Sequence, residues 1–323
     1  MTETSFATST AGHELSIRLR HPDATVRRVA LIELADEADE NNLPALIAAL
    51  ADPAAEVRGE AAGLLAGWET PQSVAGLVQT LLDPEETVRM AAAQSLSELK
   101  TREAGVQLLP WALHDNDFAR GAVLRALREL RLAEAAPAAL QSLADPVALI
   151  RREAVGVLGW LKHEAALPAL GQLARHDTDP EVRRAATGAL GLAESEYVLP
   201  DLLAALTDPI WSVREEAAST LGKLRLQAGL TGLLSALGDD YWQVRLRAAR
   251  ALGRLRLCAA LPALIETLQH EVGNLRKEAA IALGEIADAA AEPALLQAQT
   301  DPDPEVRKAA RIALAHINRK DTP

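Results

Sequence analysis

The sequence "DPEVRRAATGALG", residues Asp179–Gly191, recurs along the chain, and this repetition determines the fold. A near-copy, "DPEVRKAARIALA", occupies Asp303–Ala315, 124 residues further on, which is four times 31. Each step between successive copies of its arginine is 31 residues, except one step of 32. A fixed period of this size is typical of a solenoid of stacked repeats. We call these ten residues the repeat arginines: Arg27, Arg58, Arg89, Arg120, Arg151, Arg183, Arg214, Arg245, Arg276 and Arg307.

Each repeat contains the apolar pattern of two short helices. Counted from the repeat arginine, position +7 is always leucine, and position +3 is alanine except at Val123. Within residues 198–224, apolar residues recur at spacings of three and four over 199–206 and at a spacing of four over 213–221. The tripeptide "TDP" separates the two runs. Helices this short are marginal alone, so we expect them to be stable only when stacked on their neighbours.

The loop between the two predicted helices carries an aspartate or a histidine six residues before each repeat arginine. A pair such as Asp208-Pro209 suits the N-cap and first position of the second helix. We predict that each repeat arginine pairs with a nearby loop aspartate or helix-end carbonyl and so joins successive repeats. The alternative interpretation is a basic ladder that binds an anion. A glycine at +8, as in Gly222 and Gly253, predicts close helix packing or an early helix end.

These motifs resemble the HEAT-like repeats of the phycobilisome-lyase type, over about residues 13–318. The resemblance implies an all-α solenoid of about ten helix pairs, with the second helices on the concave side. We expect one uninterrupted solenoid over residues 13–318, a disordered polar leader over 1–12 and a short tail over 319–323. Bilin lyase subunits, a metal-dependent hydroxylase and many adaptor proteins share this repeat type, so it indicates the fold and not the function.

Composition excludes several classes of function. The net charge of -12 disfavours the wrapping of DNA or RNA and general attraction to anionic membranes. A single cysteine, Cys258, rules out an internal disulfide and fits a reducing compartment. The first residues lack the basic and apolar regions of a secretory signal, and no apolar run approaches the ~20 residues that span a bilayer. We therefore predict a monomeric cytoplasmic protein that binds neither nucleic acid nor membrane.

The sequence offers no catalytic constellation. Deoxyhypusine hydroxylase has similar repeats, and the resemblance would imply His-Glu pairs on the second helices as ligands of a di-iron centre. The matching positions here keep a glutamate without the histidine, and His163-Glu164 and His270-Glu271 fall out of register. Gly-rich phosphate loops, GxSxG and CxxC motifs are absent from the sequence. We predict no metal and no cofactor. The glutamates at the matching positions are Glu60, Glu153, Glu216 and Glu278.

A candidate partner site comes from the positions left over for the concave surface, +1, +2, +5 and +9. Arginines at spacings of three and four line one face of the second helix in repeat 8, and aromatic residues, rare in this chain, stand nearby. Tryptophan and arginine are enriched in binding hot spots. The pattern predicts a site for an acidic or carboxylate-bearing protein partner. Alternatively, the aromatics cap the core and the arginines pair with Glu215, Glu216 and Glu278. The predicted site residues are Trp160, Trp211, Tyr241, Trp242, Arg247, Arg250 and Arg254.

Three functions are compatible with these observations. The first is a non-enzymatic scaffold or adaptor that holds a protein partner on its concave face. The second is a bilin lyase-like or cofactor-maturation accessory, in which arginines would hold the propionates of a tetrapyrrole and tryptophans its rings. The third is a DNA-binding solenoid, which the net charge of -12 disfavours.

Overall fold

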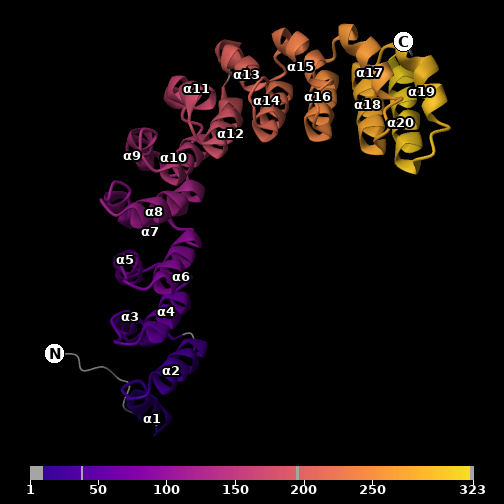
Figure 1. Cartoon of the computed structure of the whole chain (residues 1–323). Helices are drawn as coiled ribbons and strands as arrows, with labels where there is room; N and C mark the ends of the chain where they lie inside the picture. The colour runs from indigo at the N-terminus through magenta and orange to yellow at the C-terminus, as the bar shows by residue number, and fades with distance from the viewer. Residues whose placement is uncertain (1–9, 38, 194–195, 321–323) are drawn as a thin grey trace. The chain divides into compact units, whose positions relative to one another are not determined.

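A computed structural model describes residues 10–37, 39–193 and 196–320, and all regular elements in these ranges are helical. Twenty α-helices form ten successive pairs, which confirms the predicted all-α solenoid of helix pairs (Figure 1). The chain divides into two compact units, unit 1 with residues 1–161 and unit 2 with residues 162–323. We describe each unit by itself, and a single uninterrupted solenoid over 13–318 stays a prediction.

Unit 1 contains five helix pairs. Its first helices are α1 (Thr10–Arg18), α3 (Leu43–Ala49), α5 (Pro71–Thr80), α7 (Arg102–Leu108) and α9 (Ala136–Ser142). Its second helices are α2 (Ala24–Asp36), α4 (Ala55–Leu64), α6 (Glu86–Ser97), α8 (Asp117–Leu130) and α10 (Ala148–Trp160). Short 3-10 turns lie at η1 (Glu40–Asn42), η2 (Leu109–Trp111) and η3 (Ala133–Ala135).

Unit 2 contains the other five pairs. Its first helices are α11 (Leu167–His176), α13 (Leu199–Ala205), α15 (Leu230–Ala236), α17 (Leu261–Thr267) and α19 (Glu292–Ala298). Its second helices are α12 (Pro180–Ala189), α14 (Trp211–Leu224), α16 (Trp242–Leu255), α18 (Gly273–Ile286) and α20 (Pro304–Lys320). The 3-10 turns are η4 (Glu164–Ala166), η5 (Leu190–Leu192), η6 (Glu196–Val198), η7 (Gln227–Gly229), η8 (Cys258–Ala260) and η9 (Ala289–Ala291).

Helices reach into both terminal segments that the sequence analysis leaves non-helical. Helix α1 begins at Thr10, inside the predicted leader, and α20 ends at Lys320, inside the predicted tail. Residues 1–9 and 321–323 lie outside the described part of the chain. None of the helices in the described ranges is long and apolar enough to cross a membrane.

The core of each unit lies where the helices of one pair pack on each other and on the next pair. Within unit 2 the second helices α14, α16, α18 and α20 lie side by side in a row (Figure 1). The +3 residue is fully buried in every repeat, and the +7 leucine is buried in every repeat. These two positions supply the apolar contacts without which helices of 7–17 residues would not be stable.

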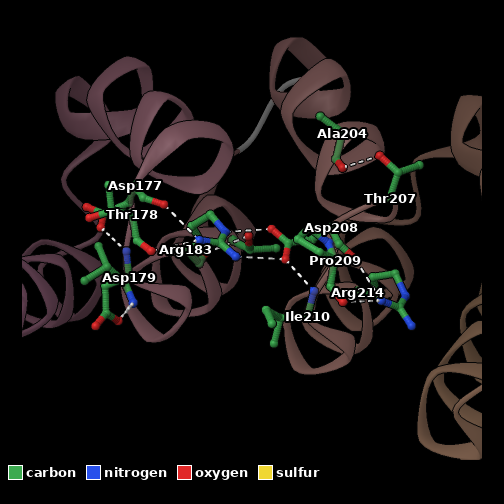
Figure 2. Close-up of polar contacts among 12 residues, drawn as sticks. Asp177, Thr178, Asp179, Arg183, Ala204, Thr207, Asp208, Pro209, Ile210 and Arg214 are labelled. Atoms are coloured by element: carbon green, nitrogen blue, oxygen red, sulfur yellow. Dashed lines mark hydrogen bonds and ion pairs between the residues drawn. The ribbon is translucent and has the colours of Figure 1, made fainter.

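Repeat arginines such as Arg183 connect successive repeats, as the sequence predicts (Figure 2), whereas within the described ranges Arg89 and Arg245 hydrogen-bond only to carbonyls of their own loops. The Arg183 guanidinium donates from Nε to Asp208 Oδ2 at 2.7 Å and from Nη2 to Asp208 Oδ1 at 3.0 Å. Its Nη1 donates to the carbonyl of Asp177 in its own loop at 2.9 Å. Such bidentate pairs are strong and geometrically specific. The same fork holds Arg27 on Asp52, Arg58 on Asp83, Arg214 on Asp239 and Arg276 on Asp301.

The predicted role of Asp208 as an N-cap is wrong. Ile210 is the N-cap residue of α14, and Asp208 stands two residues earlier, in the turn. Asp208 Oδ1 accepts the backbone N–H of Ile210 at 2.8 Å, as Figure 2 shows. The carboxylate therefore closes the turn and receives the guanidinium of Arg183, and the helix starts only after this turn. Other loop aspartates, such as Asp52 and Asp83, accept the same backbone bond.

Histidine replaces this aspartate in three loops. The Nδ1 atoms of His114 and His270 accept the backbone N–H two residues on, each at 3.0 Å. An imidazole thus accepts the backbone hydrogen bond that closes the turn, but it cannot accept two hydrogen bonds from the guanidinium of the preceding repeat arginine. Arg89 instead lies with its guanidinium 5.4 Å from the centre of the Phe118 ring. Arg245 keeps a buried Nε with no acceptor among the described residues.

The glycines at +8 serve close packing in unit 2. A Cβ added at Gly222, Gly253 or Gly284 would lie 2.7 Å from the Cα of an alanine on the next second helix. These alanines, such as Ala251 opposite Gly222, are buried at +6 of the following repeat. The helices continue past the glycines, to Leu224, Leu255 and Ile286. Of the two predicted roles, these three glycines therefore perform the first, whereas α12 ends at Ala189, just before the +8 glycine Gly191.

Candidate partner-binding surface

The structure places six of the seven predicted site residues in unit 2 and one in unit 1. Trp160 ends α10 of unit 1, where its side chain is 47% exposed. The guanidinium of Arg131 lies 5.1 Å from the centre of its ring, a cation–π contact. Trp160 belongs to unit 1 and the other six residues belong to unit 2, so Trp160 is not assigned to their surface.

Three of the four aromatic residues of unit 2 gather where α14 and α16 begin, and the fourth, Tyr197, lies in η6. Trp211 is the first residue of α14, and Tyr241 is the N-cap residue of α16. Their rings stack with centroids 5.7 Å apart and planes 15° apart. The guanidinium of Arg214 lies 5.7 Å from the centre of the Tyr241 ring. Tyr241 and Trp242 remain exposed, so these three aromatics form an apolar surface that we call the aromatic edge.

The three arginines of α16 differ in their partners. Arg247 Nε donates to Glu215 Oε1 on α14 at 2.9 Å. Arg250 donates from Nε and Nη2 to the buried Glu278 on α18, at 2.7 and 2.8 Å. The hydrogen bonds that Arg250 donates to Glu278 raise the pKa of Arg250 above its ordinary value. The interpretation that the arginines pair with Glu215 and Glu278 is therefore confirmed for two of them, and Arg254 is exposed without a polar partner among the described residues.

The aromatic edge lies at the start of α16, whereas the arginines lie from the middle of this helix to its end. Twelve residues separate Trp242 from Arg254, which at 1.5 Å per residue is about 18 Å along the helix axis. A rotation of about 100° per residue also turns Trp242 away from the side of the helix that carries the arginines. The single site predicted from the sequence therefore divides into two surfaces.

A pocket of about 230 Å³ lies between α14 and α16 at the arginine end. Its walls carry four cationic side chains and no acidic one. Lys223, on α14, is exposed and, like Arg254, has no polar partner among the described residues. Four cations around one small space favour an oxyanion. We call it the cationic pocket, and its lining residues are Ser219, Lys223, Arg247, Arg250, Ala251 and Arg254.

Acidic groups stand just outside this pocket. Glu215 and Glu278 are occupied by Arg247 and Arg250. Burial raises the pKa of Glu216, against the attraction of cations that include Arg184. The ion pairs hold Arg247 and Arg250 in place, whereas Lys223 and Arg254 keep their hydrogen-bonding capacity for a ligand.

A second pocket, of about 280 Å³, lies between α18 and α20. Ile281 and Ile312 line it and are 39% and 49% exposed. Both occupy position +5, which the sequence analysis assigns to the surface, yet it did not single them out. An isoleucine at the same exposed position in two successive repeats is the sequence pattern that indicates this apolar surface. We call this the apolar pocket because most of its wall area is apolar, with Gly284, Ala309 and Ala313 beside the two isoleucines. Its other lining residues are polar or charged: Lys277, Glu285, Glu305, Lys308 and His316.

Two glutamates expected on the surface are buried. Glu153 and Glu278, both at +2, are each 3% exposed. Glu153 accepts from Arg125 and Arg128 of the preceding second helix at 3.4 and 3.5 Å, and Glu278 accepts from Arg250. The prediction that +2 faces solvent is wrong in these repeats, because a buried carboxylate needs cationic partners. Among the described residues, no group of three or more His, Cys, Asp or Glu side chains could hold a metal ion.

Comparison with known proteins agrees with this architecture. The sequence pattern described as HEAT repeats matches residues 13–97, 43–128, 106–191, 167–241 and 230–315. No curated protein matches the chain. An engineered protein is similar in structure, with a TM-score of 0.52 and 22% identity over 94% of this chain and 98% of that one.

Two further solved structures share the fold at lower identity. Importin β is similar with a TM-score of 0.63 and 16% identity over 96% of this chain, which spans 51% of that protein. The karyopherin Kap121p, bound to the extreme C-terminus of the protein phosphatase Cdc14p, gives a TM-score of 0.57 and 17% identity, over 97% of this chain and 42% of that one. Identities this low show the fold alone. The match of the repeat pattern covers nearly the whole chain, which therefore belongs to the HEAT-repeat family.

Proposed function

We propose that this protein is a non-enzymatic interaction scaffold whose unit 2 binds a protein partner on the side formed by its second helices. The observation that carries the proposal is the cationic pocket, in which Lys223 and Arg254 are exposed and lack polar partners among the described residues. In a chain of net charge -12, such a cluster gives an acidic partner both steering and contact.

The construction of α16 supports a preformed site. Arg247 and Arg250 are fixed by Glu215 and Glu278, so the pocket walls are ordered before a partner arrives. Preorganisation lowers the entropy that binding costs. The aromatic edge of Trp211, Tyr241 and Trp242 adds a second exposed contact surface at the start of α16, about 18 Å from Arg254 along the helix axis.

The comparisons favour the scaffold over the tetrapyrrole alternative. Kap121p, a solenoid of similar fold, holds the terminus of another protein. The repeat pattern that matches is that of HEAT repeats in general. Membership of the narrower phycobilisome-lyase type, a monomeric state and a cytoplasmic location stay predictions.

Capture of partners from an extract of the native cells tests this function. The parent chain is compared with Lys223→Glu/Arg254→Glu and with Arg225→Glu/Arg311→Glu, which makes the same change of charge outside both pockets. We expect a protein that the parent and the second variant retain and the first variant loses. If every captured protein is retained equally by all three chains, the proposed function is wrong.

The variant avoids Arg250 for a structural reason. Arg250→Glu would set a second carboxylate against the buried Glu278 and would destabilise the contact between α16 and α18. A loss of binding would then reflect unfolding. Lys223 and Arg254 are exposed, so their exchange should leave the helical circular dichroism unchanged.

A further inference from the structure

The cationic and apolar pockets occupy the same level of the second helices. Ser219 and Arg250 of the first pocket and Ile281 and Ile312 of the second all stand at +5 of their repeats. Residues at the same position of successive repeats lie at the same level along neighbouring second helices, because these helices pack side by side. A chain that crosses the row of second helices at this level would therefore meet both pockets.

The contact between α16 and α18 closes the space between the two pockets. Arg250 and Glu278 bridge these helices with two hydrogen bonds, and Gly253 packs against Ala282 beneath them. A bound segment therefore passes over α16 and α18 and places side chains only into the outer two grooves.

The distance between the pockets sets the spacing of those side chains. Packed helix axes lie about 8–10 Å apart, so the α14–α16 groove and the α18–α20 groove are roughly 16–20 Å apart. An extended chain advances about 3.3–3.6 Å per residue. About five or six residues of extended chain cover this distance.

We propose that unit 2 binds an extended acidic peptide segment that crosses its second helices, with a carboxylate in the cationic pocket and an aliphatic side chain, five or six residues away, in the apolar pocket. This inference rests on the proposed function and names the chemistry of the partner. Lys223 and Arg254 supply the unused donors for the carboxylate. Ile281 and Ile312 supply apolar surface that is otherwise left to solvent.

The same features argue against a nucleic acid. A phosphate backbone repeats its charge along every nucleotide and offers no aliphatic group to the apolar pocket. The chain as a whole carries a net charge of -12, which repels a polyanion beyond the pocket itself. A segment with one local acidic group and one apolar anchor matches both pockets.

Synthetic fluorescein-labelled peptides test the spacing with the full chain. Each peptide carries a pair of glutamates and one leucine in a Gly/Ser background, with the leucine three, six or nine residues from the glutamates. Fluorescence anisotropy should show tightest binding for the six-residue spacing. Lys223→Glu/Arg254→Glu should weaken that binding about tenfold or more, because charge-assisted hydrogen bonds are lost.

Ile281→Ser/Ile312→Ser should remove the preference for the six-residue spacing without removing the need for glutamate. Arg225→Glu/Arg311→Glu, the matched charge control, should bind like the parent. Equal affinity for all three spacings overturns the inference. So does a single-stranded oligonucleotide that displaces the six-residue peptide at equal concentration. Either result leaves the proposed function standing if cellular capture still depends on Lys223 and Arg254.

Discussion

The two units share one repeat pattern but pack their second helices differently. In repeats 7, 8 and 9 of unit 2 the +8 residue is glycine, as in Gly253, and the backbone of the next second helix lies directly against it. In unit 1 the +8 residue is larger in the first four repeats. The +8 residues of those four repeats are Ala35, Ala66, Ser97 and Arg128.

The difference shows how packing can create a binding surface in a repeat protein. In repeats 7 and 8 the residue after the glycine is a cation, Lys223 or Arg254. Close approach of α14 and α16 gathers these cations around one pocket. The glycine at +8 thus allows the close helix packing that brings the cations at +9 together.

The largest expected effects come from the buried leucines at +7. Leu221→Ala in unit 2 and Leu96→Ala in unit 1 each remove a fully buried side chain and should cost roughly 2–5 kcal/mol of unfolding free energy. We expect the cost at Leu221 to lie nearer the upper limit, because tightly packed backbones cannot collapse into the cavity. Urea denaturation followed by circular dichroism measures both.

Leu314→Ala provides the comparison with an end repeat. Leu314 is 6% exposed and belongs to α20, which in the described part of the chain packs against α18 and α19 and has no following helix pair. Its cost should be smaller than that at Leu221, since stability in a solenoid depends on nearest neighbours. Equal losses at Leu221 and Leu314 would contradict nearest-neighbour stabilisation.

A bulkier side chain at +8 tests the comparison directly. Gly253→Leu should cost about 3 kcal/mol, the upper end of the range for overpacking, because even a Cβ would lie 2.7 Å from the Cα of Ala282. Ala35→Leu, at the same register in unit 1, should cost less than about 1 kcal/mol since Ala35 is only half-buried. Thermal unfolding of both variants measures the difference, and similar losses would show that the units pack alike.

The ion pairs between repeats are common to both units and should respond alike to acid. Hydrogen bonds from the repeat arginines hold the pKa of Asp52, Asp83 and Asp301 below its ordinary value. A depressed pKa contributes stability above the unfolded pKa of about 3.9, and this stability is lost as pH falls through the folded pKa. Urea midpoints should therefore be steady from about pH 8 to 5 and fall below about pH 4.

Asp83→Asn should remove part of this acid response. It leaves the guanidinium of Arg58 half-satisfied and should cost roughly 1.5–3 kcal/mol at neutral pH, the range for hydrogen bonds to charged groups. Asp115→Asn, at an exposed loop carboxylate, serves as the control and should change neither the stability nor its pH dependence. An unchanged acid response in Asp83→Asn would mean that other carboxylates control it.

Periodicity alone predicted the helix pairs, the buried +3 and +7 positions and the structural role of the repeat arginines, because each follows from a residue type that recurs at a fixed position. The candidate site was less predictable. Three arginines on one helix face look equivalent in sequence, yet Arg250 is taken by the buried Glu278 on the next helix. Such a pairing depends on how neighbouring helices pack. The start of α14 was misassigned for a similar reason, since Asp208 serves Arg183 in the preceding repeat.

The smallest expected effects concern the loops in which histidine replaces aspartate. His270→Asp should supply the missing acceptor for the buried Nε of Arg245 and keep the backbone bond to Val272, and so should stabilise unit 2 by about 1 kcal/mol. His114→Asp in unit 1 should gain less, because Arg89 already rests on the Phe118 ring. Chemical denaturation measures both gains. A larger gain in stability at His114 would contradict this expectation. It would show that the contact between Arg89 and the Phe118 ring stabilises unit 1 by less than the unsatisfied Nε of Arg245 destabilises unit 2.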